Sequence, residues 1–421
     1  MLDNLIYKKV DAEELTLAEY YEAVDYLLKN GVDAWSRKFF YSLNSFGMSK
    51  KEVLYLTLAM RDSGKVLKFN QCIMEKHSTG GVGDSTSVVL IPLLASLGFK
   101  VIKTTAKSFV FTNGSADRFG AIPKFKAKLS DDEIKSALET ANACVLSHDG
   151  DMCPADKLLH DFRAECGLET DINLMAASIA AKKLASGAKV VLVDVKYGEA
   201  SLIKDYSKAL KLANLLKYIF DECEVESTIV LTDTVQTFGD GVGNAIEVVD
   251  ALDVLRGKQN FLREMSVFFA TEMILKAKPN LKREDVEDMV KMALDNGTAY
   301  EAFLKLVKAQ GGSVKAVKED KIFKPYKTIN FVSDKEGYVG DIHPLLLGEL
   351  VRRMCQETHD SNLGISIRVK IGDYIKKGDV IVTFYYKTDE ELAKYKNAIS
   401  KCIGVTDYVV KPVDIIRKVI R

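Results

Sequence analysis

The sequence predicts an α/β protein with a small all-helical domain, a larger α/β domain with a mainly parallel sheet, and a C-terminal α+β domain. Residues 1–70 carry amphipathic helical patterns with capping residues. Short β-branched runs separated by helical patterns follow, which is typical of a parallel sheet with crossover helices. From about residue 334, apolar residues alternate around Gly-Asp turns, which indicates antiparallel strands. A chain of 421 residues is long for one hydrophobic core, so several domains are expected, with a boundary near residue 333.

Two N-terminal helices have clear start and stop signals. In "TLAEYYEAVDYLLKNG", Thr16 is a predicted N-cap, and Glu19 completes a capping box three residues later. Ser49 and Glu52 repeat this arrangement at the start of the second helix. A glycine follows each pattern, and we expect the second helix to stop at Gly64.

Three later runs are predicted strands of the parallel sheet. They are "KVIKTT" at 100–105, "AKVVLVDVK" at 188–196 and "STIVLTD" at 227–233. A strongly apolar helix, "LMAASIAAKKLASG" at 174–187, precedes the second strand. Near the C-terminus, "GISIRVKIGDYIKKGDVIVTFYY" has the alternation and the turn residues of antiparallel strands.

The composition argues against several classes of function. Lysine plus arginine and aspartate plus glutamate number 59 each, so no net charge attracts nucleic acid or an anionic membrane. The seven cysteines form no CxxC pair, which argues against a zinc site or a disulfide framework and predicts buried thiols. The first residues lack a signal-peptide core, and the apolar runs are too short to span a bilayer. We therefore expect a cytoplasmic protein.

The segment "KHSTGGVGDSTS", residues 76–87, combines three glycines, five hydroxyl side chains and Lys76 just ahead of an apolar helix. Backbone N–H groups at a helix N-terminus, together with hydroxyl donors, form an anion site that suits phosphate. A P-loop is excluded because no Gly-Lys-Ser/Thr tripeptide occurs, and Thr86 occupies the third glycine position of the dinucleotide fingerprint. The alternative is a surface turn with a Ser-rich helix cap. The adjacent Lys-His pair and the five hydroxyls favour the anion site.

Ser178 and Lys182 lie four residues apart in the apolar helix and therefore on one face of it. If this face borders a cleft, it offers a neutral donor beside a cation, and Arg163 lies fifteen residues before Ser178. The alternative is that Lys182 and Lys183 form a solvated pair near the helix C-terminus, where the helix dipole favours cations. Spacing alone favours the solvated pair.

Five motifs occur in the order seen in the pyrimidine nucleoside and thymidine phosphorylases, and the chain resembles this family over essentially its whole length. The motifs are "KHSTGGVGDSTS", "PADKLLHDFR", "AASIAAKKLASGA", "GVGNAIEV" and "VKIGDYIKKGDVI". The resemblance implies a pentosyltransferase of nucleoside salvage. Such an enzyme cleaves a nucleoside with inorganic phosphate to a free base and an α-pentose 1-phosphate. Phosphate is then a co-substrate, and no redox cofactor is implied.

The same resemblance implies a helical domain and an α/β domain that face each other across a cleft. We expect the helical domain, which carries dimer and base contacts, in residues 1–69 and 162–193. The α/β phosphate-binding domain would comprise residues 70–161 and 194–333, and the C-terminal α+β domain residues 334–421. The family implies a homodimer whose partners are a nucleoside and phosphate, with no nucleic acid or membrane.

The matched motifs also carry over site residues. The residues that match phosphate ligands are Lys76, Ser78, Ser87, Thr105 and Ser115. The residues implied on the base side are His77, His160, Arg163, Ser178, Lys182 and Leu202. Among these, the implied catalytic residues are His77, Arg163 and Lys182, because a cation can bind a developing oxyanion and an imidazole can donate to the base. A monovalent-cation (K+) site of some members would involve Gly83, Ser85 and Glu247.

Four segments depart from the family pattern, and they cluster on the nucleobase and pentose side of the implied site. In residues 105–115, the family's arginine, histidine and glycine are replaced by Lys107, Phe111 and Asn113. The other departures are His160 for a tyrosine, the altered segment 164–174, and Leu202 for a phenylalanine.

These departures leave three functions open. The first is phosphorolysis of uridine, deoxyuridine or thymidine by a divergent enzyme. The second is a phosphorylase for another nucleoside or a nucleotide, since "GSADRF" and "LETDINLMAASI" resemble the AMP phosphorylases, whose additional N-terminal domain is not matched here. The third is a non-catalytic paralogue that binds a nucleoside or phosphate. The intact base-gripping residues favour the first function.

Overall fold

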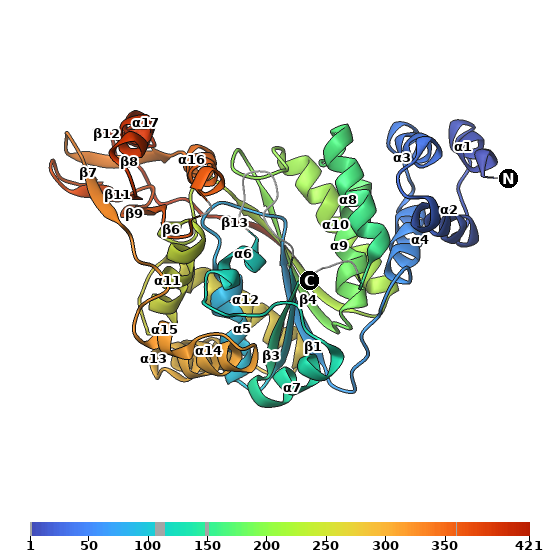
Figure 1. Cartoon of the computed structure of the whole chain (residues 1–421), viewed down its shortest axis with the longest axis horizontal. Coiled ribbons are helices and arrows are strands. Elements are labelled where there is room, and N and C mark those ends of the chain that lie inside the picture. The colour runs from blue at the N-terminus through green and yellow to red at the C-terminus, as the bar shows by residue number, and fades with distance from the viewer. Residues whose placement is uncertain (1, 106–113, 148–150, 359) are drawn as a thin grey trace.

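The protein, described by a computed structural model, is built around one large sheet (Figure 1). The structure describes residues 2–105, 114–147, 151–358 and 360–421. The N-terminal helices lie at one end of the molecule, and the small C-terminal sheets lie at the other. A parallel-rich sheet with helices around it and antiparallel sheets near the C-terminus confirm the predicted fold class.

The large sheet has six strands in the order β13-β5-β4-β1-β2-β3. The neighbours from β5 to β3 are parallel, and β13 pairs antiparallel with β5. The predicted strand at 100–105 is β2, and the other two predicted runs form β4 and β5 with slightly shifted ends. The strands are β1 (Ile73–Ser78), β2 (Lys100–Thr105), β3 (Ala143–Ser147), β4 (Val190–Tyr197), β5 (Glu226–Asp233) and β13 (Ile416–Ile420).

Helices cover both faces of this sheet, which is why its strands are buried on both sides. Along β4, Leu192 enters the core beneath α5, whereas Val191 and Val193 enter the core shared with α9 and α10, because successive side chains point to opposite faces. The helices on the α5 side are α5 (Thr86–Ser96), α6 (Ser115–Gly120), α11 (Asn244–Leu255), α12 (Phe261–Ala277), α13 (Arg283–Asp295), α14 (Thr298–Ala309) and α15 (Val314–Lys318). Helix α7 (Asp131–Ala141) packs beside β3.

The N-terminal helices share one apolar core with helices that follow much later in the chain. Thr16 and Ser49 form the predicted capping boxes with Glu19 and Glu52. The second of these helices stops at Arg61 rather than at Gly64, because Asp62 already takes the C-cap position. The helices of this part are α1 (Asp3–Val10), α2 (Leu17–Asn30), α3 (Ala34–Phe46), α4 (Lys50–Arg61), α8 (Pro154–Cys166), α9 (Ile172–Ala185) and α10 (Tyr206–Glu222).

The C-terminal part contains two small antiparallel sheets, as its alternation predicts. It is tied to the rest of the molecule at two places, because β6 comes from the segment before α11 and β13 returns to the large sheet. The predicted domain boundaries stay a prediction. The elements are β6 (Gly241–Val242), β7 (Lys327–Val332), β8 (Gly337–Ile342), α16 (Pro344–Thr358), β9 (Gly364–Ile367), β10 (Tyr374–Ile375), β11 (Val380–Tyr386), α17 (Asp389–Ile399) and β12 (Ile403–Thr406).

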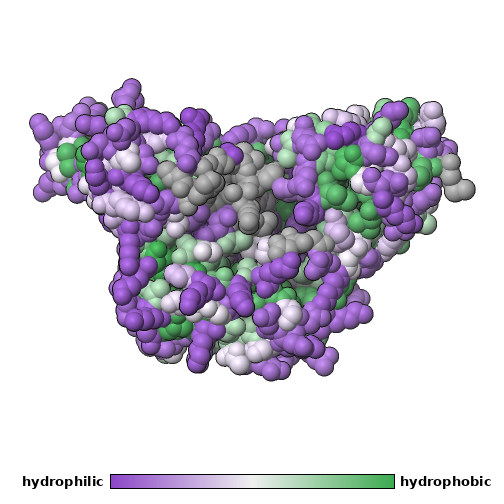
Figure 2. All heavy atoms as spheres, viewed as in Figure 1, coloured by the Kyte–Doolittle hydropathy of each residue, from purple (hydrophilic) through white to green (hydrophobic). Residues whose placement is uncertain are grey.

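Hydrophilic residues cover much of the face shown in Figure 2, and apolar residues come to this surface in several places. The large apolar side chains that α1 and α3 leave exposed are Tyr7, Val10, Tyr41 and Phe46. Within the described ranges, no helix is long and apolar enough to cross a membrane. All seven cysteines are free thiols. The expectation of buried thiols is confirmed for Cys144, Cys153 and Cys402. It is wrong for Cys72, which is exposed, and the other three are only partly buried.

Candidate active site

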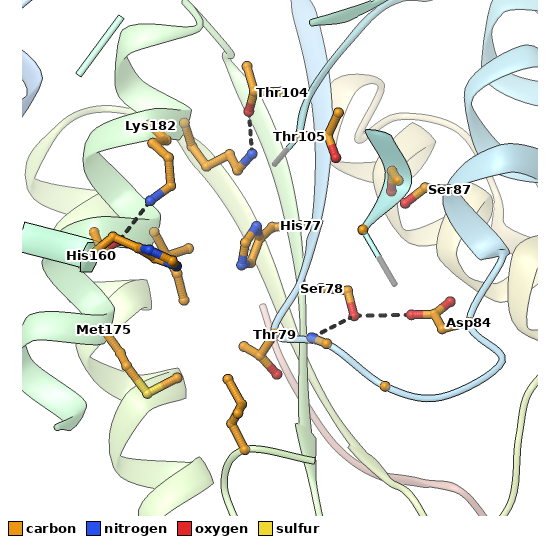
Figure 3. A pocket seen from close by; sticks show the side chains of 18 of the residues that line it. His77, Ser78, Thr79, Asp84, Ser87, Thr104, Thr105, His160, Met175 and Lys182 are labelled. Atoms are coloured by element: carbon orange, nitrogen blue, oxygen red, sulfur yellow. Dashed lines mark hydrogen bonds between the residues drawn. The ribbon is translucent and has the colours of Figure 1, made fainter. Parts of the chain in front are cut away.

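One cavity lies between helices α8 and α9 on one side and the carboxyl ends of β1 and β2 on the other. Ligands of open α/β sheets bind at this edge, where the loops after the strands converge. Figure 3 shows His160, Met175 and Lys182 on the helical side and Ser78, Asp84, Ser87 and Thr105 on the sheet side, with His77 between them. The predicted site residues that line this cavity are His77, Ser78, Ser87, Thr105, Ser115, His160, Arg163, Ser178, Lys182 and Leu202.

The segment 76–87 is part strand and part loop, which differs from the single loop that its composition indicates. Residues 76–78 are the last residues of β1, and α5 begins at Thr86. Because side chains alternate along a strand, Lys76 and Ser78 point to one face and His77 to the other. The polar residues of the segment therefore serve two different sides of the sheet.

Lys76 does not line the cavity, although the resemblance implies that it contacts phosphate. Its Nζ donates to Thr86 Oγ1 at 2.8 Å and lies 3.5 Å from Asp84 Oδ2 and 3.8 Å from Asp194 Oδ2. The ammonium also lies 5.3 Å from the centre of the Phe269 ring. Lys76 therefore sits behind the glycine-rich loop, and its direct contact with phosphate stays a prediction.

A buried carboxylate holds the glycine-rich loop in shape. Asp84 Oδ2 accepts from Ser78 Oγ at 3.0 Å, and Asp84 Oδ1 accepts from the Thr86 backbone N–H at 3.1 Å. Burial opposes ionisation, but the ammonium groups of Lys196 and Lys76 outweigh it and hold the pKa of Asp84 well below its usual range. The loop is thus fixed before any ligand arrives, which favours preorganised binding.

The helical side of the cavity brings together the predicted base-binding residues. Lys182 Nζ donates to Ser178 Oγ at 2.7 Å and lies 2.5 Å from Asp156 Oδ2. The Arg163 guanidinium donates to the carbonyl oxygens of residues 168 and 169, at 3.2 and 2.6 Å. The solvated pair favoured by spacing alone is wrong, because the side chain of Lys182 is 15% exposed and that of Lys183 only 1%. Lys183 instead forms a buried ion pair with Glu75.

His77 lies between the two sides, half-buried and close to several cations. Burial first, and then the neighbouring Lys183, Lys103, Lys182 and Lys76, lowers the pKa of His77 well below its ordinary value of 6.5. The imidazole is therefore neutral at pH 7 and can donate a hydrogen bond from its protonated nitrogen without being an imidazolium.

We expect the His77 imidazole to stay neutral between pH 8 and about pH 6, where an ordinary histidine takes up its proton. The unfolded chain gains this proton as the pH falls through about 6.5, whereas the folded chain does not, so the His77 contribution to the free energy of unfolding decreases below that pH. An NMR titration of the five histidines checks this, with His77→Asn identifying the signal. A His77 signal that titrates near 6.5 would contradict the expectation.

Sequence reasoning missed several residues that the structure places in or beside the cavity. Lys103 and Lys183 line it, and Asp156 and Glu75 are the buried carboxylates that hold Lys182 and Lys183. A signal was available for Lys103, because a lysine inside a β-branched strand of a parallel sheet points into a buried layer. No comparable signal marked Glu75, since the strand that contains it was not recognised as one.

The residues implied for a monovalent cation do not fit one. Glu247 Oε2 accepts from Arg118 Nε at 2.5 Å, and Glu247 Oε1 accepts from the Gly243 N–H at 3.1 Å. The carbonyl of Gly83 accepts from the Gly239 N–H at 2.9 Å. A cation would satisfy the buried Ser85 hydroxyl, which has no hydrogen-bond partner in the described part of the chain. However, the Arg118 guanidinium already neutralises Glu247, which is the only carboxylate among the three implied residues. A second cation there would therefore be repelled.

We expect the wild-type protein to have the same Tm in potassium chloride as in choline chloride of equal concentration. Arg118→Ala should instead be stabilised by K+, because it leaves the buried Glu247 carboxylate without a counter-charge. Thermal denaturation in the two salts measures this, and Arg353→Ala on the exposed face of α16 is a matched control. A specific rise in the wild-type Tm with K+ would contradict the expectation.

The departures from the family pattern fall in three groups. The altered segment 164–174 joins α8 to α9, and Glu169 within it lines the cavity. His160 and Leu202 line the cavity, on the side of α8 and after β4 respectively. Lys107, Phe111 and Asn113 lie outside the described residues.

The fold and this cavity define a class of protein: an α/β fold with a glycine- and hydroxyl-rich loop on the sheet side of its cavity and two cationic side chains, Arg163 and Lys182, on the helical side. Residues 70–300 match the family model described as "Glycosyl transferase family, a/b domain", and residues 338–406 match the "Pyrimidine nucleoside phosphorylase C-terminal domain". The chain belongs to the pyrimidine nucleoside and thymidine phosphorylase family.

Similar proteins support this membership. The chain is 30% identical to the pyrimidine-nucleoside phosphorylase of Geobacillus stearothermophilus over 400 residues, which cover 92% of each chain. It is 31% identical to the thymidine phosphorylase of Mycoplasmoides pirum over 80% of this chain and 84% of that protein. The crystal structure of anthranilate phosphoribosyltransferase from Thermus thermophilus matches with a TM-score of 0.60 at 16% identity, covering 73% of this chain and 99% of that one. At this identity the last likeness concerns the fold alone.

Proposed function

We propose that the protein cleaves a pyrimidine nucleoside with inorganic phosphate to give a free base and an α-pentose 1-phosphate. The observation that carries this proposal is the cavity in which hydroxyl donors of the sheet side face Arg163, Ser178 and Lys182 of the helical side. A phosphate and a base held on opposite sides would place the pentose between them, next to His77.

The proposed reaction needs few parts. A phosphate oxygen attacks C1′ and forms the new C–O bond, while the C1′–N bond breaks and its electron pair passes to the base. Lys182 and Arg163 stabilise the negative charge that develops on the base oxygens. The neutral imidazole of His77 donates a hydrogen bond to the leaving base, and the proton that the base finally takes up comes from solvent or phosphate.

Incubation of the purified protein with phosphate and a nucleoside panel tests the function. Release of uracil or thymine that depends on phosphate supports the proposal. Release restricted to another nucleoside or a nucleotide would show that the protein is a phosphorylase whose altered base pocket has changed its specificity. Ligand binding without any turnover would assign a non-catalytic binding protein.

We also propose that the protein is a homodimer in the cytoplasm. The four large apolar side chains exposed on α1 and α3 support dimerisation through the helical part, because apolar residues gathered on adjacent helices often belong to an interface. Light scattering after gel filtration measures the mass in solution. A monomer at micromolar concentration would contradict the proposal.

A further inference from the structure

Lys103 is a buried lysine of the cavity without a negatively charged partner among the described residues. It lies on β2, lines the cavity, and is 5% exposed. Its Nζ donates to the backbone carbonyl of Lys76 at 2.8 Å, and no carboxylate of the described residues lies within ion-pair distance. A buried ammonium with one neutral acceptor is poorly compensated, because removing a charge from water costs several kcal/mol.

The other buried lysines of the described chain differ from Lys103 in this respect. Each of them has a carboxylate within 4 Å, and the pairs are Lys9–Glu52, Lys76–Asp84, Lys183–Glu75 and Lys196–Asp194. Apart from Lys103, the buried ammonium groups of the described chain are thus each neutralised by a carboxylate of the same chain. The counter-charge that Lys103 lacks must come from outside the described chain if the ammonium is to form.

The position of Lys103 indicates which ligand group supplies this charge. Thr105 lies two residues further along β2 and therefore on the same face of the strand. Ser78 and Ser87, which the resemblance of the motifs implies as phosphate ligands, line the same cavity. We propose that Lys103 binds the inorganic phosphate directly and that the phosphate is its missing counter-ion. This inference rests on the proposed function, because it takes phosphate to be the substrate on the sheet side.

Phosphate binding should then be coupled to proton uptake. Burial first, and then Lys183 and Lys76, lowers the pKa of Lys103 well below its ordinary value, and Glu75 and Asp84 oppose this only in part. A phosphate beside the amine favours the ammonium form and raises this pKa again. The charged groups that act on Lys103 electrostatically are Glu75 and Lys76 of β1, Asp84 of the loop and Lys183 of α9, and Arg118 of α6 lines the same cavity.

Calorimetric titration of inorganic phosphate, without nucleoside, tests the inference. We expect Lys103→Met to weaken phosphate binding by about 10- to 100-fold, the range for losing a charged hydrogen bond. Repeating the titration in two buffers with different ionisation enthalpies measures proton uptake, which the wild type should show. Lys103→Arg should retain most of the affinity but take up no proton through this residue, because arginine is always charged.

A control variant and a stability measurement exclude a general effect of the substitution on the fold. Lys100→Met, on the same strand, should bind phosphate as the wild type does, because its Nζ donates to Leu138 O and Asn142 Oδ1 away from the cavity. Lys103→Met should be as stable as the wild type, since a buried amine with one neutral acceptor is replaced by an apolar side chain, and Lys103→Gln serves if the methionine variant does not fold.

The outcomes separate this inference from the proposed function. Wild-type affinity in Lys103→Met or Lys103→Gln, or no phosphate binding by the wild type, overturns the role of Lys103. Lysine-dependent phosphate binding together with no base release from any nucleoside would support Lys103 as a phosphate ligand and overturn the proposed reaction.

Discussion

Replacing Lys182 by alanine is expected to lower kcat/KM for phosphorolysis by about 10²- to 10³-fold, the usual effect of removing one preorganised donor to a developing oxyanion. Lys182 lines the cavity from α9, and Ser178 and Asp156 hold its ammonium in place. The loss should appear mainly in kcat if the interaction forms with the charge of the leaving base. Steady-state kinetics with the nucleoside identified in the panel measures both parameters.

The control for this prediction lies on the neighbouring helix. Lys157 is exposed on α8 directly after Asp156, and Lys157→Ala should leave kcat/KM unchanged. Chemical denaturation of both variants shows whether either protein has lost its fold. A Lys182→Ala variant that is folded and retains wild-type kinetics would show that Lys182 does not stabilise the leaving base.

Replacing Lys183 by methionine is expected to lower the free energy of unfolding by about 3–5 kcal/mol, because it leaves a buried carboxylate without its counter-charge. Lys183 of α9 pairs with Glu75 of β1, and both side chains are at most 1% exposed. Thr104 of β2 and Ser186, directly after α9, also donate to this carboxylate. The ion pair and these hydrogen bonds therefore join α9 to β1 and β2, the two strands whose carboxyl ends border the cavity.

A double-mutant cycle separates the ion pair from packing. Glu75→Gln combined with Lys183→Met removes both charges, keeps an acceptor for Thr104, and should recover part of the lost stability. Lys208→Met, in a pair with Asp205 whose side chains are both 61% exposed, should have an effect below about 1 kcal/mol. Equal denaturation midpoints for Lys183→Met and Lys208→Met would contradict the role of the buried pair.

Much of the fold could be predicted because it depends on local signals. A capping box needs only four consecutive residues, so the starts of α2 and α4 were readable from Thr16 and Ser49. Strand β2 was predicted at 100–105 because its β-branched run stands alone between loops. The stop of α4 was missed because Asp62 and Gly64 are both plausible helix ends, and packing decides between them.

Strand β1 could not be predicted from the local sequence, and the reason is physical. Its residues 75–77 are Glu, Lys and His, which single-sequence reasoning assigns to a solvated loop. They are buried or nearly so because partners from other elements, such as Lys183 and Asp84, neutralise the charges. Such compensation joins residues far apart in the sequence and leaves no local pattern.

The sequence by itself determined the fold class, the family, and the residues proposed to bind phosphate and base. It could not decide which lysines line the cavity. The tertiary structure places Lys103 and Lys182 at the cavity, Lys76 behind the loop, and Lys183 in an ion pair at the cavity floor. Side-chain direction is set by strand alternation and by the partners that packing brings within reach, and both exist only once the sheet and helices have assembled.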